Sequence, residues 1–196
     1  YLFRARERAN TIDPATPEYA VLDRKITVLG EKLVEYANNS AKAIVDNTLK
    51  DLKHGTEKKG AMTADDLRKL ADSVDDKSKY VLKIFDAVSA GQKTSGVSKD
   101  YFLNQSVKLD GVSVKLKETI IQVDYTQKVD GYMAKARTVL SKGGDPIRNM
   151  QNAYRYIKDA EKSARENKEP VVADLRKQKQ HAIKDLKSAL SDYASD

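Results

Sequence analysis

Apolar residues recur at alternating steps of three and four along two long stretches of the chain, residues 17–53 and 146–194. This spacing places them along one side of an α-helix. The stripe of the first stretch consists of Leu22, Ile26, Leu29, Leu33, Ala37, Ala41, Ile44, Thr48 and Leu52. Thr16 can cap this helix, Pro17 suits its first position, and Lys53-His54-Gly55 is typical of a helix end. We therefore expect one continuous helix from Pro17 to Lys53.

A second helix is expected after a loop at residues 56–62. Thr63 and Asp66 have the spacing of a capping box, with Asp in place of the usual Glu. Gly91 marks the end of this helix, and the polar run 75–79 in its middle predicts a bend or an exposed turn. Residues 91–98 form a second expected loop. Its glycines have the spacing of a phosphate-binding loop, but the Lys-Ser/Thr pair that this motif requires after the second glycine is absent.

The segment 101–116 fits two structures. Its apolar residues alternate around Asp110-Gly111, as in a β-hairpin. Leu109, Val112 and Leu116 also continue into a helical pattern that reaches Leu140. We favour a helix from about residue 112, with a β-hairpin near 105–117 as the alternative.

The last stretch begins with Asp145 and Pro146, a cap followed by a favourable first residue. Pro170 interrupts it, because proline lacks the backbone donor and clashes with the preceding turn. The result is a single kinked helix or two helices that meet at 167–169, and we expect the kink because no glycine-rich loop intervenes. Short connections predict antiparallel neighbours. The expected fold is all-α: an elongated, kinked three- to four-helix antiparallel bundle that forms a single domain over residues 1–196.

Composition changes this picture little. The chain has 196 residues, a net charge of +7 and a pI near 9.3, which favours contact with anionic partners. It has no Cys, so disulfides and thiolate chemistry are excluded. No apolar run reaches the roughly 18–20 residues that span a bilayer. Because the chain begins at Tyr1 in mid-pattern, we expect it to be a fragment of a longer protein.

Catalytic signals are weak. His54 and His181 have no acidic residue at metal-ligand spacing. The acidic pairs are better explained as helix caps and solvated positions than as a catalytic dyad, and no nucleophile elbow is present. We expect no enzyme, no metal site and no cofactor.

Tyrosines give the strongest hint of a binding site. Tyr154 and Tyr156 cannot both be buried on one helix face, and an exposed Tyr beside Arg155 is typical of an interface hot spot. Tyr125 and Tyr132 lie two turns apart on the preceding helix. We take these five residues as candidates for partner binding.

A basic patch is expected at Arg176, Lys177, Lys179 and Lys184. Such residues along one helix face can bind nucleic acid. Acidic residues intervene, however, and would repel phosphate, so an ordinary solvated face is the favoured interpretation. Nucleic acid is therefore kept only as an alternative partner.

The succession of helices resembles S-type pyocins and related colicin-like bacteriocins. The resemblance rests on the long Lys/Glu helix over 22–52, the loop 54–63 with Lys58-Lys59, the shorter helix over 65–88 and the kinked helix over 146–194. It implies a secreted bacterial protein with kinked three-helix bundles that bind an outer-membrane receptor or surface polysaccharide. The apolar hairpin of a pore-forming domain and the His-rich signature of a nuclease domain are absent, which implies a recognition or spacer module. No family site residue transfers to this chain.

The expected function is therefore that of a non-enzymatic helical module for receptor or cell-surface recognition. One alternative is a structural or assembly coiled-coil protein, such as a secretion-tip, virion or adaptor subunit, that associates through an apolar stripe left open. The other is nucleic-acid binding through the basic last helix. A secreted location follows from the resemblance, and the composition is equally compatible with the cytoplasm.

Overall fold

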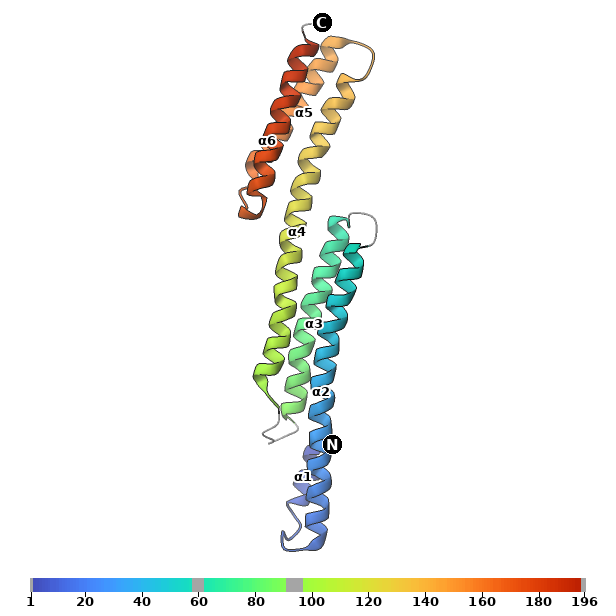
Figure 1. Ribbon diagram of the computed structural model, residues 1–196, viewed down its shortest axis with the longest axis vertical. Helices are drawn as coiled ribbons and strands as arrows, with labels where there is room; N and C mark the ends of the chain where they lie inside the picture. The colour runs from blue at the N-terminus through green and yellow to red at the C-terminus, as the bar shows by residue number, and fades with distance from the viewer. Residues whose placement is uncertain (1, 58–61, 91–96, 195–196) are drawn as a thin grey trace. The chain divides into compact units, whose positions relative to one another are not determined.

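The computed structural model describes residues 2–57, 62–90 and 97–194. These residues form helices joined by short connections, with no strand among them, which confirms the all-α prediction (Figure 1). The elements are α1 (Leu2–Ala9), α2 (Pro17–Glu57), α3 (Ala64–Ala90), α4 (Lys99–Leu140), α5 (Pro146–Glu166), the 3-10 turn η1 (Pro170–Val172) and α6 (Ala173–Tyr193).

The chain divides into two compact units. Unit 1 comprises residues 1–62 and 69–115, and unit 2 comprises residues 63–68 and 116–196. Helices α3 and α4 therefore contribute to both units. The assignment of a single domain stays a prediction, and each unit is described by itself.

Helix α2 in unit 1 begins as expected, because Thr16 Oγ1 accepts a hydrogen bond from the backbone N–H of Tyr19 at 3.3 Å. It ends later than expected. The predicted stop at Lys53-His54-Gly55 is wrong, since the helix continues to Glu57. A glycine inside a helix costs only about 1 kcal/mol, so Gly55 does not by itself end one. Residues 58–61 of the predicted loop lie outside the described residues.

Helix α1 was not expected from the sequence. It covers only eight residues, and its last residue, Ala9, is buried. The helix packs against α2 within unit 1. Helices this short are marginal in water, so α1 depends on that packing.

The capping box of α3 is confirmed. The backbone N–H of Thr63 donates to Asp66 Oδ2, and the backbone N–H of Asp66 donates to Thr63 Oγ1, both at 3.2 Å. The expected exposed turn at 75–79 is wrong, because the helix is unbroken there and Ser78 is buried. Ser78 Oγ lies 2.7 Å from Ser106 Oγ and donates to Asp110 Oδ1 at 2.6 Å. The polar run therefore contains a helix contact between α3 and α4. The predicted stop, Gly91, lies outside the described residues.

The β-hairpin alternative near 105–117 is wrong, and α4 begins at Lys99 instead of near residue 112. Its buried stripe in this region is Phe102, Gln105, Ser106, Leu109, Ser113, Leu116 and Ile120. Three of these seven core positions carry polar side chains, which hides the helical periodicity in the sequence. The alternation of valines is incidental, because Val107 and Val114 are exposed.

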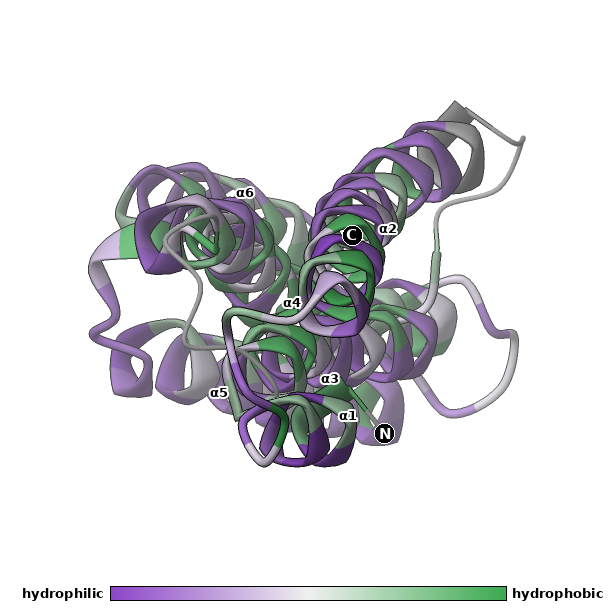
Figure 2. Cartoon of the chain, turned by 90° about the horizontal axis from the view of Figure 1, so that it is seen from below, coloured by the Kyte–Doolittle hydropathy of each residue, from purple (hydrophilic) through white to green (hydrophobic). Residues whose placement is uncertain are grey.

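Unit 2 is a three-helix arrangement of the second part of α4 with α5 and α6. Its core contains Tyr125, Val129, Met133, Ala136, Ala153, Ile157, Ala160, Ala164, Val172, Ile183 and Leu186. Asp145 caps α5 as predicted, since its Oδ1 accepts the backbone N–H groups of Ile147 and Arg148. Figure 2 shows apolar and polar residues alternating along the helices, as expected for elements with one covered side.

The predicted kink at Pro170 is wrong. Helix α5 ends at Glu166, and α6 runs back beside it, so the stretch forms two helices that meet at 167–169 (Figure 1). Asn167 is extended, with φ −80° and ψ 108°, and its Oδ1 accepts the backbone N–H of Glu169 at 3.0 Å. Glu169 precedes Pro170, and the proline ring clashes with a helical conformation of the residue before it. The polar Asn and the Pro make the reversal without a glycine.

Candidate functional site

The tyrosines of α5 face different environments. Tyr154 is 51% exposed, which confirms the prediction that at least one of Tyr154 and Tyr156 lies at the surface. Tyr156 is half-buried against the core of unit 2. The Lys135 ammonium on α4 lies 5.9 Å from the Tyr156 ring centroid and 5.5 Å from that of Tyr132. These distances allow cation–π attraction, so Tyr132 and Tyr156 form one aromatic and basic cluster with Lys135.

Tyr125 does not belong to a surface for partners. It is only 4% exposed and lies in the core of unit 2, which removes it from the candidate binding residues. Its hydroxyl has no hydrogen-bond partner among the described residues. Burial raises the pKa of this phenol, while Arg176 lowers it to a lesser extent. The two-turn spacing from Tyr132 could not reveal this, because it places both rings on one side of α4 without showing that other helices cover that side.

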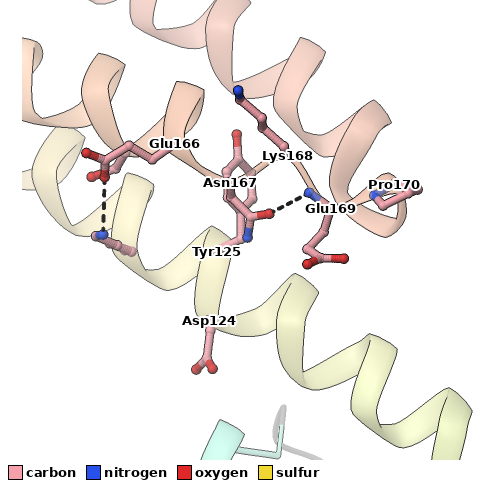
Figure 3. A pocket seen from close by; sticks show the side chains of 9 residues that line it. Asp124, Tyr125, Glu166, Asn167, Lys168, Glu169 and Pro170 are labelled. Atoms are coloured by element: carbon pink, nitrogen blue, oxygen red, sulfur yellow. Dashed lines mark hydrogen bonds and ion pairs between the residues drawn. The ribbon is translucent and has the colours of Figure 1, made fainter.

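Tyr125 lies at an open crevice beside the connection between α5 and α6 (Figure 3). Asp124 and Lys128 line it from α4, and Glu166 to Pro170 line it from the connection. Lys128 Nζ is 3.9 Å from Glu166 Oε2, a loose ion pair at the surface. Tyr125 and Asn167 therefore line the same crevice, at the point where the chain reverses.

The predicted basic patch is divided by the structure. Lys179 Nζ donates to both carboxylate oxygens of Asp130 on α4, at 2.8 and 2.7 Å, and its side chain is mostly covered. Arg176 donates to the backbone carbonyl of Glu169 at 3.3 Å. Lys177 is exposed and pairs with Asp174. The expectation of a shared basic face is thus wrong for Lys179, because the side of α6 that carries it packs against α4.

Lys184 is the remaining member of that predicted patch, and it is exposed. It lines a small hollow between α5 and α6 together with Glu161 and Lys187. Lys187 Nζ donates to Glu161 Oε1 at 2.5 Å. This hydrogen bond is the main reason why the pKa of Glu161 is lowered, and Arg165 and Lys158 lower it further.

The most distinct surface feature of unit 1 is an uncovered apolar seam on α2. Leu29, Leu33 and Tyr36 follow one another at steps of four and three, and they are 56%, 37% and 72% exposed. We call these three residues the open seam. Leu29 and Leu33 belong to the same stripe as Ile26 and Ala37, which are both buried, so the stripe is uncovered only between these two positions. Val21 and Val28, also exposed, lie beside it.

The sequence already places Leu29 and Leu33 in the apolar stripe of this helix. It cannot say that they are uncovered, because burial depends on which helices reach that part of α2. Tyr36 was missed as a candidate, although its spacing from Leu29 by seven residues marks the same face. A surface group of large apolar side chains is a typical sign of a protein contact.

Two other kinds of site, a metal site and a membrane-spanning helix, are not found among the described residues. No three His, Asp or Glu side chains there lie close enough together to hold a metal ion. None of the described helices combines the length and the hydropathy that crossing a membrane requires. His181 is exposed on α6, whereas the side chain of His54 and the glycine-rich segment 91–96 lie outside the description.

Comparisons with known proteins provide no further assignment. No protein-family model matches the chain, and neither a curated protein nor a solved structure matches it. The class that the fold and surfaces define is an all-α helical protein with an uncovered apolar seam.

Proposed function

We propose that this chain is a non-enzymatic helical module that binds a protein partner through the open seam of α2. The exposure of Leu29, Leu33 and Tyr36 on one helix face is the observation that carries the proposal. Large apolar side chains at such spacing are the anchors with which a helix enters a groove or pairs with another helix. Tyr is also among the residues enriched in interface hot spots.

The resemblance to pyocins and colicin-like bacteriocins suggests one class of partner, an outer-membrane receptor or a surface polysaccharide of a target cell. An apolar seam fits a protein receptor better than a polysaccharide, because sugars offer mainly hydroxyl groups to a binding surface. The proposed partner within this class is therefore a receptor protein, and the proposed location is extracellular.

A second candidate function is assembly with further copies of the same chain. The seam favours it because positions 22, 26, 29, 33 and 36 follow the alternating spacing of a coiled-coil seam. In that case the seam would be covered by the same helix of a second copy.

The experiment is a paired substitution, Leu29→Glu with Leu33→Glu. A charge at these positions cannot be buried in an interface without a large cost, so binding should weaken at least tenfold. The matched control is Val107→Glu with Val114→Glu, which changes two exposed apolar residues of α4 in the same unit. Circular dichroism and thermal unfolding check that both variants keep their helices.

Two measurements separate the candidates. Sedimentation velocity over a range of concentrations detects self-association, and binding of labelled protein to intact and protease-treated bacterial outer membranes detects a protein receptor. Self-association that only the α2 variant loses supports assembly. Protease-sensitive binding that only the α2 variant loses supports the receptor. If the wild type does neither, or if the α2 variant and the control behave alike, the seam is not a binding site.

A further inference from the structure

The outer side of α5 carries a row of basic residues that is interrupted by Gln151. At successive steps of three, four, three, four and three, the exposed positions along it are Arg148, Gln151, Arg155, Lys158, Lys162 and Arg165. We call this row the α5 ridge. The spacing places the row on one face, opposite the buried alanines and isoleucine of the same helix. At 1.5 Å per residue it is about 25 Å long, with a side chain every ~5 Å.

Two of the three acidic residues of α5, Glu161 and Glu166, are directed toward its neighbours, whereas Asp159 lies on the ridge side, one turn from Arg155. Glu161 accepts from Lys187 on α6 at 2.5 Å, and Glu166 lies 3.9 Å from Lys128 on α4. Each also reaches back to the ridge at a longer distance, Glu161 to Arg165 at 3.9 Å and Glu166 to Lys162 at 3.7 Å. The packing of unit 2 thus separates charges that the sequence mixes, and most of the positive charge is left outside.

The first half of the ridge keeps its charge uncompensated. Arg148 and Arg155 form no ion pair with any described residue. In residues 131–158 the only acidic residue is Asp145, whose carboxylate is occupied as the helix cap, and the next one along the chain is Asp159. An anion would therefore meet little repulsion near Arg148, and Asp159 is the acidic residue that borders this half at its far end.

An exposed aromatic ring borders the ridge. Tyr154 is 51% exposed, and the Lys158 ammonium lies 5.4 Å from its ring centroid. On the other side, the Arg155 guanidinium carbon is 5.8 Å from the Tyr156 ring centroid. Basic side chains beside an accessible aromatic face are the combination that binds single-stranded nucleic acids, in which bases stack on rings while cations hold the backbone.

We propose that the α5 ridge binds a single strand of nucleic acid, with the phosphates along Arg148, Arg155, Lys158, Lys162 and Arg165 and a base against Tyr154. Arg favours phosphate because its planar guanidinium can donate two parallel hydrogen bonds. A partner helix fits less well, because the ridge holds no apolar residue from which to form a seam. This proposal concerns α5 only and is independent of the open seam on α2.

The salt dependence gives a quantitative test. A strand that neutralises five cations should bind with a slope of about −3.5 for log K against log salt. Raising the salt concentration from 50 to 200 mM should then weaken binding of fluorescein-labelled oligo(dT) or oligo(U) about 100-fold. The measurement uses the complete chain and fluorescence anisotropy.

The decisive variant is Arg148→Gln with Arg155→Gln. Removing two of five contacts should change the slope to about −2 and weaken binding at low salt. The matched control, Lys177→Gln with Lys184→Gln, removes the same net charge from exposed positions of α6. It should leave the slope unchanged. Tyr154→Ala should weaken binding about tenfold at an unchanged slope, since stacking is not a counterion effect.

Three results would overturn the proposal. The first is no binding of either oligonucleotide at low salt. The second is an equal effect of the α5 variant and the α6 control, which would mean attraction by net charge alone. The third is equal competition by polyglutamate or by phosphatidylserine vesicles, because the ridge would then recognise anions in general and not a nucleic acid strand.

Discussion

Lys179 on α6 and Asp130 on α4 form a two-fold hydrogen-bonded ion pair, with Nζ to Oδ distances of 2.8 and 2.7 Å. A residue that the sequence places in a basic surface patch is therefore a link between two helices. Further along the same interface, the Gln122 side chain donates to the backbone carbonyl of Val171 at 3.0 Å. Because Gln122 precedes Asp130 on α4 and Val171 in η1 precedes Lys179 on α6, α4 and α6 run parallel in unit 2.

This pairing predicts different roles for neighbouring lysines. Lys179→Met should lower the free energy of unfolding by about 1–2 kcal/mol, because the partly covered Asp130 loses its charged donor. Lys177→Met, which removes a lysine from an exposed pair with Asp174, should change it by less than about 0.5 kcal/mol. Urea unfolding followed by circular dichroism measures both. Equal effects would show that the bond to Asp130 adds no stability.

Glu161 predicts a dependence of stability on pH. Its native pKa lies below the ordinary value of 4.5, mainly because Lys187 donates to its carboxylate. At mildly acidic pH the native chain thus holds fewer protons than the unfolded chain, so the contribution is present above pH 4.5 and is lost as the pH falls through the native pKa.

Glu161→Gln should accordingly destabilise the chain by about 1 kcal/mol at pH 7, and the difference from wild type should shrink in acid. Glu118→Gln changes an exposed glutamate of α4 and serves as the control for the loss of one carboxylate. Urea midpoints measured from neutral to acidic pH make the comparison. A difference for Glu161→Gln that stays constant with pH would contradict the role of the Lys187 bond.

Two buried serines of unit 1 should respond in opposite directions. Ser78 is bonded to Ser106 and Asp110, so Ser78→Ala should cost about 1–2 kcal/mol by leaving the Ser106 hydroxyl without this partner. Ser113 is also buried, but its hydroxyl has no partner among the described residues. Ser113→Ala should stabilise by about 0.5–1 kcal/mol, because Ala removes an unsatisfied group and favours the helix. Thermal unfolding of both variants measures these changes. Unfolding temperatures that shift in the same direction would contradict the prediction.

Adjacent glycines between α4 and α5 give a test of backbone conformation alone. Gly144 has φ of 119°, whereas Gly143 does not, and an added Cβ would meet no atom within 4 Å at either position. Gly144→Ala should therefore destabilise by about 1 kcal/mol or more through strain, and Gly143→Ala should be close to neutral. Chemical denaturation distinguishes them, and equal stabilities would mean that the connection relaxes to another conformation.

Local features of the sequence predicted α2, α3 and α5 together with their starts. Thr16, Thr63 and Asp145 cap helices as their neighbours indicate, because a cap involves only residues within one turn. The stripe of α2 was also readable. Predictions failed where the chain uses polar side chains in the core, as at Gln105, Ser106 and Ser113, because hydrophobic periodicity cannot detect them.

Among the candidate binding residues, the sequence could establish only that Tyr154 and Tyr156 differ in exposure. It could not tell that Tyr125 is buried, because hydropathy does not say which face of α4 a neighbouring helix covers. Nor could it decide between a kink and a reversal at Pro170. Both begin with the same loss of a helical bond, and the packing of α6 against α5 selects the reversal.

The sequence by itself therefore determined an all-α protein and the positions of its caps, since those depend on contacts between near neighbours in the chain. The tertiary structure alone decided which apolar and charged positions remain at the surface. Leu29 and Leu33 are uncovered although their pattern is that of a core, while Ile26 and Ala37 of the same stripe are buried. The α5 ridge is basic because Glu161 and Glu166 turn toward Lys187 and Lys128, residues distant in sequence that only the packing of three helices brings close.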